Sequence, residues 1–567
     1  MPSIFSLRSG LALAAAATAA CSMSGAEDPS GDGVGFGGAQ DIGQFRDILR
    51  QGGIPGVDTL DATGFFAEHQ VDLPPASCQQ TLCLTPMLAR GTNWLTRKPQ
   101  TTLQLTVTTP TDPATLPRRP LDLVVVIDRS GSMSEDGRLQ KVQRGLRLLV
   151  QQLRAEDRLA LVAFDDRVEV RAPWGSSVAT LTQAIDNLTP GGSTNLHGGL
   201  QAGLLLAASA ANPERESRVL FLSDGLATAG ITSRSAIIEL AERHVAGGIG
   251  VSTIGVGRQF DAVLMRSLAE RGAGNFYFLE DAQAVDEVFT EELKVSMTPL
   301  ALDLRLRVTF GPGYNLMSVA GRQGWSGGAS GGTLAIPAAF ATSRQDAPPT
   351  MGRRGGGGAL FFELSELPAL EGGVVASIEL SYRTPGSTVR QVHTATVQPI
   401  EPAAADAPQP AVSHPAMQKL AAMYNLYRGL REATVGASQY ARCTIGTLRR
   451  TADGAARWNL TTADSDVTAD LVLIELFIAN LRRAGFAEAT EAEWNDSYEQ
   501  CRATPTPSPE EYEDTQHQHM GCSSARSAGG LLPLWLALWA LGRRRAGRAR
   551  RTGRDAKSSK TAAPAPR

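Results

Sequence analysis

Between residues 121 and 297, short apolar runs alternate with longer stretches in which apolar residues recur every three or four positions. The run at 121–127, LDLVVVI, is almost wholly apolar, which is typical of a strand buried on both faces of a parallel sheet. Further strands are predicted at 159–164, 219–222, 250–255 and 275–278, with an edge arm at 168–172, and helices at 138–153, 178–188, 195–211, 233–245, 262–270 and 282–295. This order predicts an α/β fold, a doubly wound parallel sheet with right-handed crossovers.

Polar side chains follow the first of these strands. Asp128, Ser130 and Ser132 lie in one tight loop just past its carboxyl end, where ligands bind in open α/β sheets. One carboxylate and two hydroxyls at alternate positions offer hard oxygen ligands, which suit Mg²⁺ or Mn²⁺ better than zinc or copper. The alternative is a polar turn that only caps the next helix.

Two later loops favour the metal site. Thr194 follows Gly191-Gly192-Ser193, and Asp224 ends the apolar run RVLFLS before Gly225. A DxSxS loop, then a loop threonine, then a strand-terminal Asp-Gly closely resembles the von Willebrand factor A domain and its metal-ion-dependent adhesion site. The resemblance implies a Rossmann-like fold and five metal ligands, Asp128, Ser130, Ser132, Thr194 and Asp224.

The resemblance also implies a function. In the family, one coordination position of the Mg²⁺ stays open, and an acidic residue of a protein partner fills it. The chain is therefore expected to be a non-enzymatic adhesion or assembly protein without catalytic residues. The alternative is a regulatory or catalytic subunit of an envelope enzyme complex. With 54 basic and 57 acidic residues, the chain gives no reason to expect a nucleic-acid partner.

Other motifs have more ordinary explanations. Ser326 lies in GWSGG, which matches the nucleophile-elbow pattern but lacks the strand before it and the helix after it. His197 is expected to cap a helix, and Asp165 and Asp166 to lie in a solvated turn. The glycine run 355–358 lacks the Gly-Lys-Ser/Thr ending of a phosphate-binding loop and reads as a flexible turn.

The N-terminal region predicts export. Residues 1–20 combine Arg8 with an alanine-rich apolar run, the layout of an export signal, and 21–40 form a flexible tether. The residues before Cys21 resemble a bacterial lipobox, which implies a lipid anchor; ordinary cleavage is the alternative. Residues 41–118 are expected to form an N-terminal module, because the stretch QFRDILRQGGIPGVDTLDATGFFAEH at 44–69 resembles the module that precedes the A domain in a group of bacterial von Willebrand factor proteins. An exported chain favours a Cys78–Cys83 disulfide over a two-thiol metal site.

Alternating apolar residues after position 298 predict an antiparallel β domain, plausible as a sandwich, at 298–400. A linker at 401–415 precedes a small helical region at 416–502, where we expect a Cys443–Cys501 disulfide. A polar linker at 503–520 leads to a sorting segment at 521–551 and a basic tail at 552–567. Cys522, the apolar run 531–541 and the arginines at 543–545 resemble a MYXO-CTERM-type sorting signal, which implies membrane anchoring at one or both ends and a location in the cell envelope, at the outer membrane or cell surface.

Overall fold

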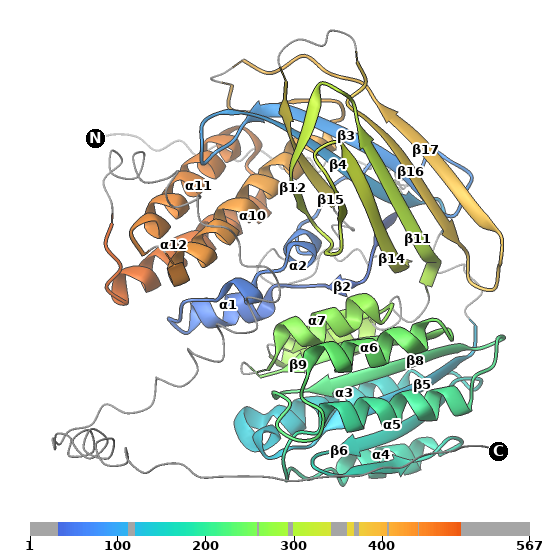
Figure 1. Cartoon of the computed structure of the whole chain (residues 1–567). Helices are drawn as coiled ribbons and strands as arrows, with labels where there is room; N and C mark the ends of the chain where they lie inside the picture. The colour runs from blue at the N-terminus through green and yellow to red at the C-terminus, as the bar shows by residue number, and fades with distance from the viewer. Residues whose placement is uncertain are drawn as a thin grey trace, which may run out of the picture. The chain divides into compact units, whose positions relative to one another are not determined.

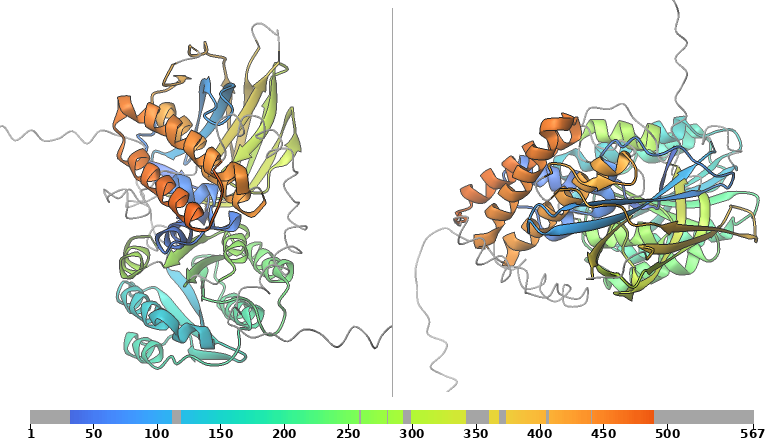
Figure 2. Two further views of the ribbon diagram at one scale, coloured as in Figure 1. Left: turned by 90° about the vertical axis from the view of Figure 1, so that its left-hand side faces the viewer. Right: turned by 90° about the horizontal axis from the view of Figure 1, so that it is seen from above.

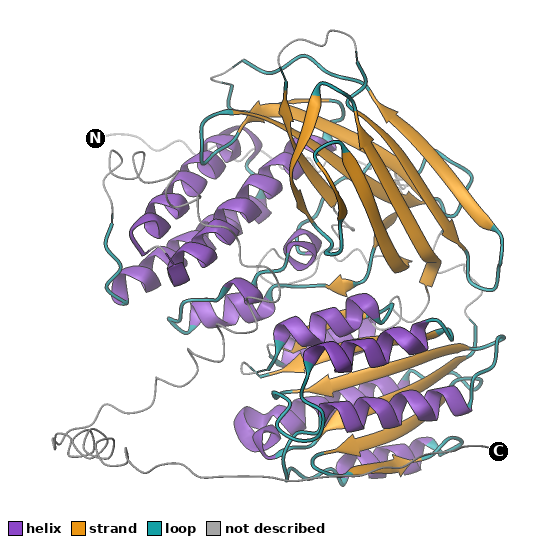
Figure 3. Ribbon diagram, in the orientation of Figure 1, coloured by secondary structure: helices purple, strands orange, loops and turns teal. Residues whose placement is uncertain are grey.

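The computed structural model describes residues 32–111, 119–257, 260–279, 281–292, 299–341, 360–367, 373–404, 407–439 and 441–488. The predicted export signal, Cys21, Cys501, Cys522 and the sorting segment lie outside these residues. Figure 1 labels the elements, and Figure 3 distinguishes helices from strands.

Seven strands form the α/β sheet in the order β2-β10-β9-β8-β5-β6-β7. All neighbours in this sheet pair in parallel except β7, which pairs antiparallel with β6. The bounds are β2 (Gly38–Ala39), β5 (Leu121–Asp128), β6 (Arg158–Phe164), β7 (Val168–Ala172), β8 (Glu216–Ser223), β9 (Ile249–Val256) and β10 (Asn275–Leu279). The predicted α/β class is confirmed.

Helices cover both faces of this sheet because alternate residues of each strand enter different cores. On β5, Leu123 and Val125 pack with one set of helices, and Val124 and Val126 pack with the other. The first set is α3 (Arg138–Gln151), α4 (Val178–Asp186) and α8 (Ala282–Glu287). The second set is α5 (Leu196–Ser209), α6 (Arg234–Val245) and α7 (Ala262–Arg271).

The predicted tether at 21–40 is wrong for its last part. Strand β1 (Asp32–Gly35) and strand β2 both lie inside it. β2 extends the α/β sheet beside β10, and β1 pairs with β4 (Pro99–Thr109) and β14 (Gly331–Ala341). Glycine-rich sequence suggested a linker, but Val34 and Phe36 are almost completely buried and hold the segment in place.

Antiparallel strands form two sheets that face one another across a single apolar core, and β1 pairs with a strand of each. One sheet consists of β3 (Cys83–Thr92), β4, β12 (Tyr314–Ala320), β15 (Leu360–Glu366) and β18 (Ala411–Val412). The other consists of β11 (Pro299–Phe310), β13 (Ser326–Gly328), β14, β16 (Ala376–Arg383) and β17 (Arg390–Val397). Strands from before residue 121 thus share the predicted β domain with strands from after residue 298.

The run LQLTVT at 103–108 alternates apolar and polar residues, which predicts a strand with one solvated face. In the structure it belongs to β4, and every residue of that strand after Pro99 is buried. Helix α10 (Ala416–Gln439) covers part of the polar face, where the Asn425 amide donates to Gln100 Oε1 at 3.2 Å. Thr106 Oγ1 donates to Gln104 Oε1 at 2.6 Å, so these two polar side chains are paired inside the protein.

A group of helices packs around a separate apolar core. It contains α1 (Gly43–Arg50), the short helix α2 (Ala62–Ala67), α10 (Ala416–Gln439), α11 (Ala441–Thr462) and α12 (Ser465–Arg483). Both views of Figure 2 show α10, α11 and α12 side by side. The 3-10 turn Val57–Thr59 joins α1 to α2.

The Cys78–Cys83 disulfide is present, as predicted. Cys443 is disulfide-bonded as well, but Cys501 is outside the described residues, so that pairing stays a prediction. Among the residues that the structure describes, no helix has the length and hydropathy needed to cross a membrane.

Candidate metal centre in the α/β domain

Three loops at one edge of the parallel sheet carry the predicted ligands. β5 ends at Asp128, and β8, its neighbour in parallel, ends just before Asp224. Parallel neighbours end at the same edge, so these two carboxylates come together. The 3-10 turn Gly131–Gly137 carries Ser132, and Thr194 lies in the loop just before α5.

The hydroxyl side chains connect these loops. Ser132 Oγ donates to Asp224 Oδ1 at 2.8 Å and lies 3.1 Å from Ser130 Oγ. A Cβ atom placed on Gly225 would lie 3.4 Å from Thr194 Oγ1 and 3.8 Å from Ser132 Oγ, so both hydroxyls border the same small space. The structure brings together the side chains that the sequence predicted.

Asp128 is held rigidly at the base of the site. Its side chain is inaccessible, Ser223 Oγ donates to Oδ2 at 2.6 Å, and the backbone N–H of Ser130 donates to Oδ1 at 2.8 Å. Burial raises the pKa of Asp128 to about 6, and these hydrogen bonds act against that rise. Two fixed donors therefore set the direction of the carboxylate.

Asp224 has a cationic partner. Arg138, the first residue of α3, donates from Nη1 to Asp224 Oδ2 at 2.7 Å and to the backbone oxygen of Ser132 at 3.2 Å. Both side chains are almost fully buried. The guanidinium therefore offsets the charge of one of the two carboxylates and links α3 to the loop after β8.

Backbone hydrogen bonds fix the loops relative to one another. Gly131 N–H donates to the oxygen of Gly192, and Gly191 N–H donates to the oxygen of Arg129. Gly192 has φ +75°, and a Cβ there would lie 2.3 Å from Asp166 Oδ1, so only glycine fits. The DxSxS loop and the Thr194 loop thus form one braced unit.

Residues 123–226 match the sequence profile of the von Willebrand factor type A domain family. This part of the chain is a von Willebrand factor type A domain.

Relatives of the domain occur in bacteria and animals. Uncharacterized protein YfbK of Escherichia coli (strain K12) is 31% identical over 196 residues, which cover 34% of each chain. Inter-alpha-trypsin inhibitor heavy chain H1 of Mesocricetus auratus is 29% identical over 175 residues, covering 29% of this chain and 19% of that protein. The chain thus spans about a third or less of the length of these two relatives.

Solved structures resemble it at low identity. The von Willebrand factor type A protein of Catenulispora acidiphila has 14% identity and a TM-score of 0.43, covering 67% of this chain and 88% of that one. A structure of proximal thread matrix protein 1 from the mussel byssus, with a zinc-occupied MIDAS motif, has 19% identity and a TM-score of 0.27 and covers 30% and 46%.

The donor set of the von Willebrand factor type A domain fits a divalent cation. Two carboxylates and three hydroxyls are hard oxygen donors, and a hydroxyl that donates its proton to a carboxylate, as Ser132 does, keeps lone pairs for a metal. Within the described ranges, no three His, Cys, Asp or Glu side chains gather as a metal site. A metal here therefore depends on Ser130, Ser132 and Thr194.

The structure corrects two secondary expectations. Asn195, and not His197, caps α5, because its side chain accepts from Gly198 N–H at 2.9 Å. Asp165 is buried and pairs with Arg129 at 2.9 Å, whereas Asp166 is exposed, as expected of a turn. Ser326 is exposed on β13 and pairs in register with Thr333 on β14, so the strand-to-helix turn of a nucleophile elbow is absent there.

Sequence reasoning missed the residues that support the ligands. Ser223 is the last residue of β8 and directly precedes Asp224, so its place at the same strand end was readable. Arg138 was assigned only to a helix, and its charge gave no indication of its partner, which is 86 positions away in the chain.

Proposed function

We propose that the protein is an exported, envelope-anchored, non-enzymatic protein that binds a protein partner through a divalent cation, Mg²⁺ or Mn²⁺, in its von Willebrand factor type A domain. One observation carries the proposal: oxygen side chains from three separate loops meet at one sheet edge. The ligands would be Asp128, Ser130, Ser132, Thr194 and Asp224.

The charges at the site support an acidic partner. Asp128 and Asp224 carry two negative charges, and the guanidinium of Arg138 offsets one of them. The exposed Glu135 also pairs with this guanidinium, at 3.0 Å. A bound divalent ion would offset the remaining negative charge and would supply an open position for a carboxylate oxygen. A Glu or Asp side chain of a partner protein fits this position better than a neutral group.

The comparisons agree with a binding role, since von Willebrand factor type A domains commonly mediate protein interactions. Export and anchoring rest on the sequence at the two ends of the chain: the apolar run before Cys21, and Cys522 with the apolar run and arginines after it. An outer-membrane or cell-surface location follows from these signals.

Calorimetric titration of the full chain with Mg²⁺, Mn²⁺ and Zn²⁺ tests the metal site. We expect binding by the wild-type protein and none by Asp128→Ala. Asp166→Ala is the matched control, because Asp166 is an exposed carboxylate on a neighbouring loop and its loss should leave metal binding unchanged. Circular dichroism establishes that both variants are folded.

Capture of partners from envelope extract tests the binding role. A genuine partner is retained with metal by the wild-type and Asp166→Ala proteins, and is released by EDTA. Asp128→Ala should not retain it. If Asp128→Ala binds metal, or if it captures the same partner in EDTA, the proposed site is wrong.

A further inference from the structure

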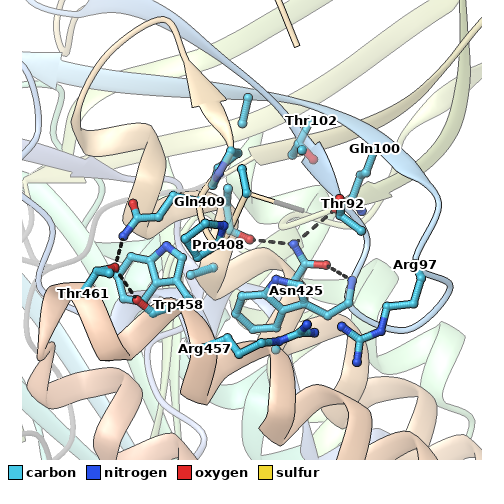
Figure 4. A pocket seen from close by; sticks show the side chains of 18 of the residues that line it. Thr92, Arg97, Gln100, Thr102, Pro408, Gln409, Asn425, Arg457, Trp458 and Thr461 are labelled. Atoms are coloured by element: carbon cyan, nitrogen blue, oxygen red, sulfur yellow. Dashed lines mark hydrogen bonds between the residues drawn. The ribbon is translucent and has the colours of Figure 1, made fainter. Parts of the chain in front are cut away.

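A second candidate site lies outside the von Willebrand factor type A domain. It is a cavity of about 390 Å³ between the β3–β4 hairpin, residues 407–410 and helices α10 and α11. Figure 4 shows its lining, which contains two tryptophans, two arginines and several amide and hydroxyl side chains. This volume and this mixture are typical of pockets that bind small molecules.

Two polar atoms in the lining have no partner among the residues that the structure describes. Trp458 is 3% exposed, and its indole Nε1–H donates to nothing. Gln409 donates from Nε2 to Thr461 Oγ1 at 2.7 Å, but its buried Oε1 accepts nothing. In Figure 4, Trp458 and Gln409 lie along the same wall of the cavity. Because buried polar groups are normally paired, one free donor and one free acceptor here indicate a ligand that supplies both partners.

The two other amides in the lining, Asn425 and Gln100, are already satisfied, and Gln100 Nε2 donates to Glu363 Oε1 at 3.1 Å. Asn425 Oδ1 accepts from Trp94 N–H at 3.2 Å, and its Nδ2 donates to Gln100 Oε1 and to the backbone oxygen of Ala421. Asn425 therefore shapes the wall, and recognition falls to Trp458 and Gln409.

The charge of the lining is positive. Arg97 and Arg457 are both exposed, and none of the lining residues that the structure describes is Asp or Glu. Their guanidinium groups point toward one another in Figure 4. Arg457 Nε donates a weak hydrogen bond to the backbone oxygen of Asp453 at 3.3 Å. Two neighbouring guanidiniums without a lining acid attract an anion and repel an amine.

The apolar wall is closely packed and in place without a ligand. A Cβ on Gly454 would lie 2.4 Å from Trp94 Cγ, so the absence of a side chain at Gly454 lets the Trp94 indole rest directly on α11. Likewise, a Cβ on Gly91 would lie 2.8 Å from Pro410 Cβ. Rigid indole and proline surfaces of this kind suit a ligand with a flat or apolar face.

We propose that this cavity binds a small organic carboxylate. The carboxylate pairs with Arg97 and Arg457, an adjacent group accepts from Trp458 Nε1 and donates to Gln409 Oε1, and an apolar face rests on the tryptophan rings. An N-acylated amino acid or peptide end has this chemistry, and so does a uronic acid. Free amino acids are disfavoured because the lining offers no acid for their ammonium group.

Titration of the full chain with four probes, followed by tryptophan fluorescence and calorimetry, tests the proposal and separates the two sources. The anions are N-acetylphenylalanine and glucuronate, and their neutral counterparts are N-acetylphenylalaninamide and glucose. We expect one anion to bind at least roughly tenfold more tightly than its neutral counterpart, the usual effect of losing a charged hydrogen bond. If neither anion binds below about 10 mM, or if the neutral probes bind equally well, the proposal is overturned.

Variants locate the binding. Arg457→Gln should weaken the anion roughly tenfold, and Trp458→Phe, which keeps the ring and removes the N–H, about fivefold. Arg449→Gln is the matched control, an exposed arginine on α11 that does not line the cavity. Asp128→Ala should bind the probe like the wild type. The test of the cavity is therefore independent of the test of the metal site. Equal affinity of Arg457→Gln and Arg449→Gln would contradict the assignment.

Discussion

At the scale of single residues, Asp224 and Arg138 form a buried ion pair inside the candidate metal site, 2.7 Å apart. Removing one member of such a pair leaves an uncompensated charge in the interior, which is far more costly than losing a surface pair. The predicted ligands could be read from the sequence because Asp128 and Asp224 lie at strand ends, and because the two serines and Thr194 complete the order of the von Willebrand factor A pattern. Arg138 could not, because its role depends on where the turn Gly131–Gly137 places it.

We expect Arg138→Gln to lower the free energy of unfolding by about 3–5 kcal/mol when metal is absent, since Asp224 loses its cation. Saturating Mg²⁺ should restore part of this loss, because the ion supplies positive charge at the same carboxylate. Urea unfolding with EDTA and with Mg²⁺ measures both values. Arg144→Gln, which breaks an exposed ion pair with Asp286, should have little effect in either buffer. The same loss for Arg138→Gln in both buffers would contradict the explanation.

At the scale of elements, helix α5 lies unusually close to the strands beneath it. A Cβ on Gly199 would lie 2.5 Å from the Phe164 ring, and one on Gly203 would lie 2.3 Å from Val126 Cγ2. These glycines are one helical turn apart and face β6 and β5. Since α5 begins directly after Thr194, its close approach also sets how near Thr194 lies to Asp128.

We therefore expect Gly203→Ala to destabilise the protein by about 1–3 kcal/mol, although alanine is the better helix former. It should also weaken metal binding as the Thr194 loop moves outward. Leu205→Ala, at an exposed position of the same helix, is the control. The double variant Gly203→Ala/Val126→Ala should recover metal affinity, because it removes the methyl that the new Cβ meets. Titration calorimetry on the three variants measures their affinity for the metal.

The segment that follows α2 is joined to α12 by a buried pair, in which His69 Nε2 lies 2.8 Å from Asp470 Oδ2. Burial alone would lower the pKa of His69, but the Asp470 carboxylate, with smaller contributions from Asp466 and the Phe65 backbone oxygen, outweighs it, and the pKa is raised above 6.5. A raised folded-state pKa stabilises the protein below the ordinary pKa, and this contribution is lost as the pH rises through the raised value.

The stability difference between the wild type and His69→Gln should accordingly be largest near pH 5, where His69 is protonated in both the folded and the unfolded protein, and should shrink as the pH rises through the raised pKa. Urea unfolding between pH 5 and pH 9 tests this expectation. His244→Gln is the comparison, because its ring Nδ1–H donates to the Leu240 backbone oxygen of its own helix at 2.9 Å and no carboxylate pair is involved in that bond. A difference that is constant across the pH range would mean that the His69 charge does not contribute.

The elements of the α/β domain were predictable because each has its own periodicity. β7 and the starts of α3, α4 and α7 agree with the sequence to the residue. Strand β14 was not predicted, because Gly331 and Gly332 at its start read as a turn, and the strand depends on its pairing with β1, β11 and β13. The sequence analysis expected a helical region at 416–502 without placing α11 in it, because α11 is rich in arginines, threonines and small residues and has few large apolar ones, and its burial depends on α10 and α12.

At the scale of the whole molecule, the short strands β1 and β2 connect distant parts of the chain. The backbone of Gln40 follows β2 and donates to the oxygen of Phe276 at 3.1 Å, and Asp41 Oδ2 accepts from Phe278 N–H. These pairings could not be read from the sequence, because a glycine-rich stretch shows neither period and its partners are hundreds of residues away.

Two shortened chains test the contribution of these strands. A chain beginning at residue 32 keeps β1 and β2, and one beginning at residue 41 lacks both. Because Val34 and Phe36 are buried, and each buried side chain of this size contributes about 1.5–3 kcal/mol, the second chain should be less stable by at least roughly 3 kcal/mol. Thermal and urea unfolding give the comparison. Equal stability of the two chains would show that the segment is dispensable.

The pairing of β1 also has a consequence for biosynthesis. Val34 lies opposite Ala341 on β14, so a ribosome has to synthesise the intervening polypeptide before this strand finds its second neighbour. Until then, the apolar side chains of Val34 and Phe36 are not buried by β14, and the nascent chain can misassemble. Because this long loop has to close first, we expect the amino-terminal segment to dock slowly and late in folding.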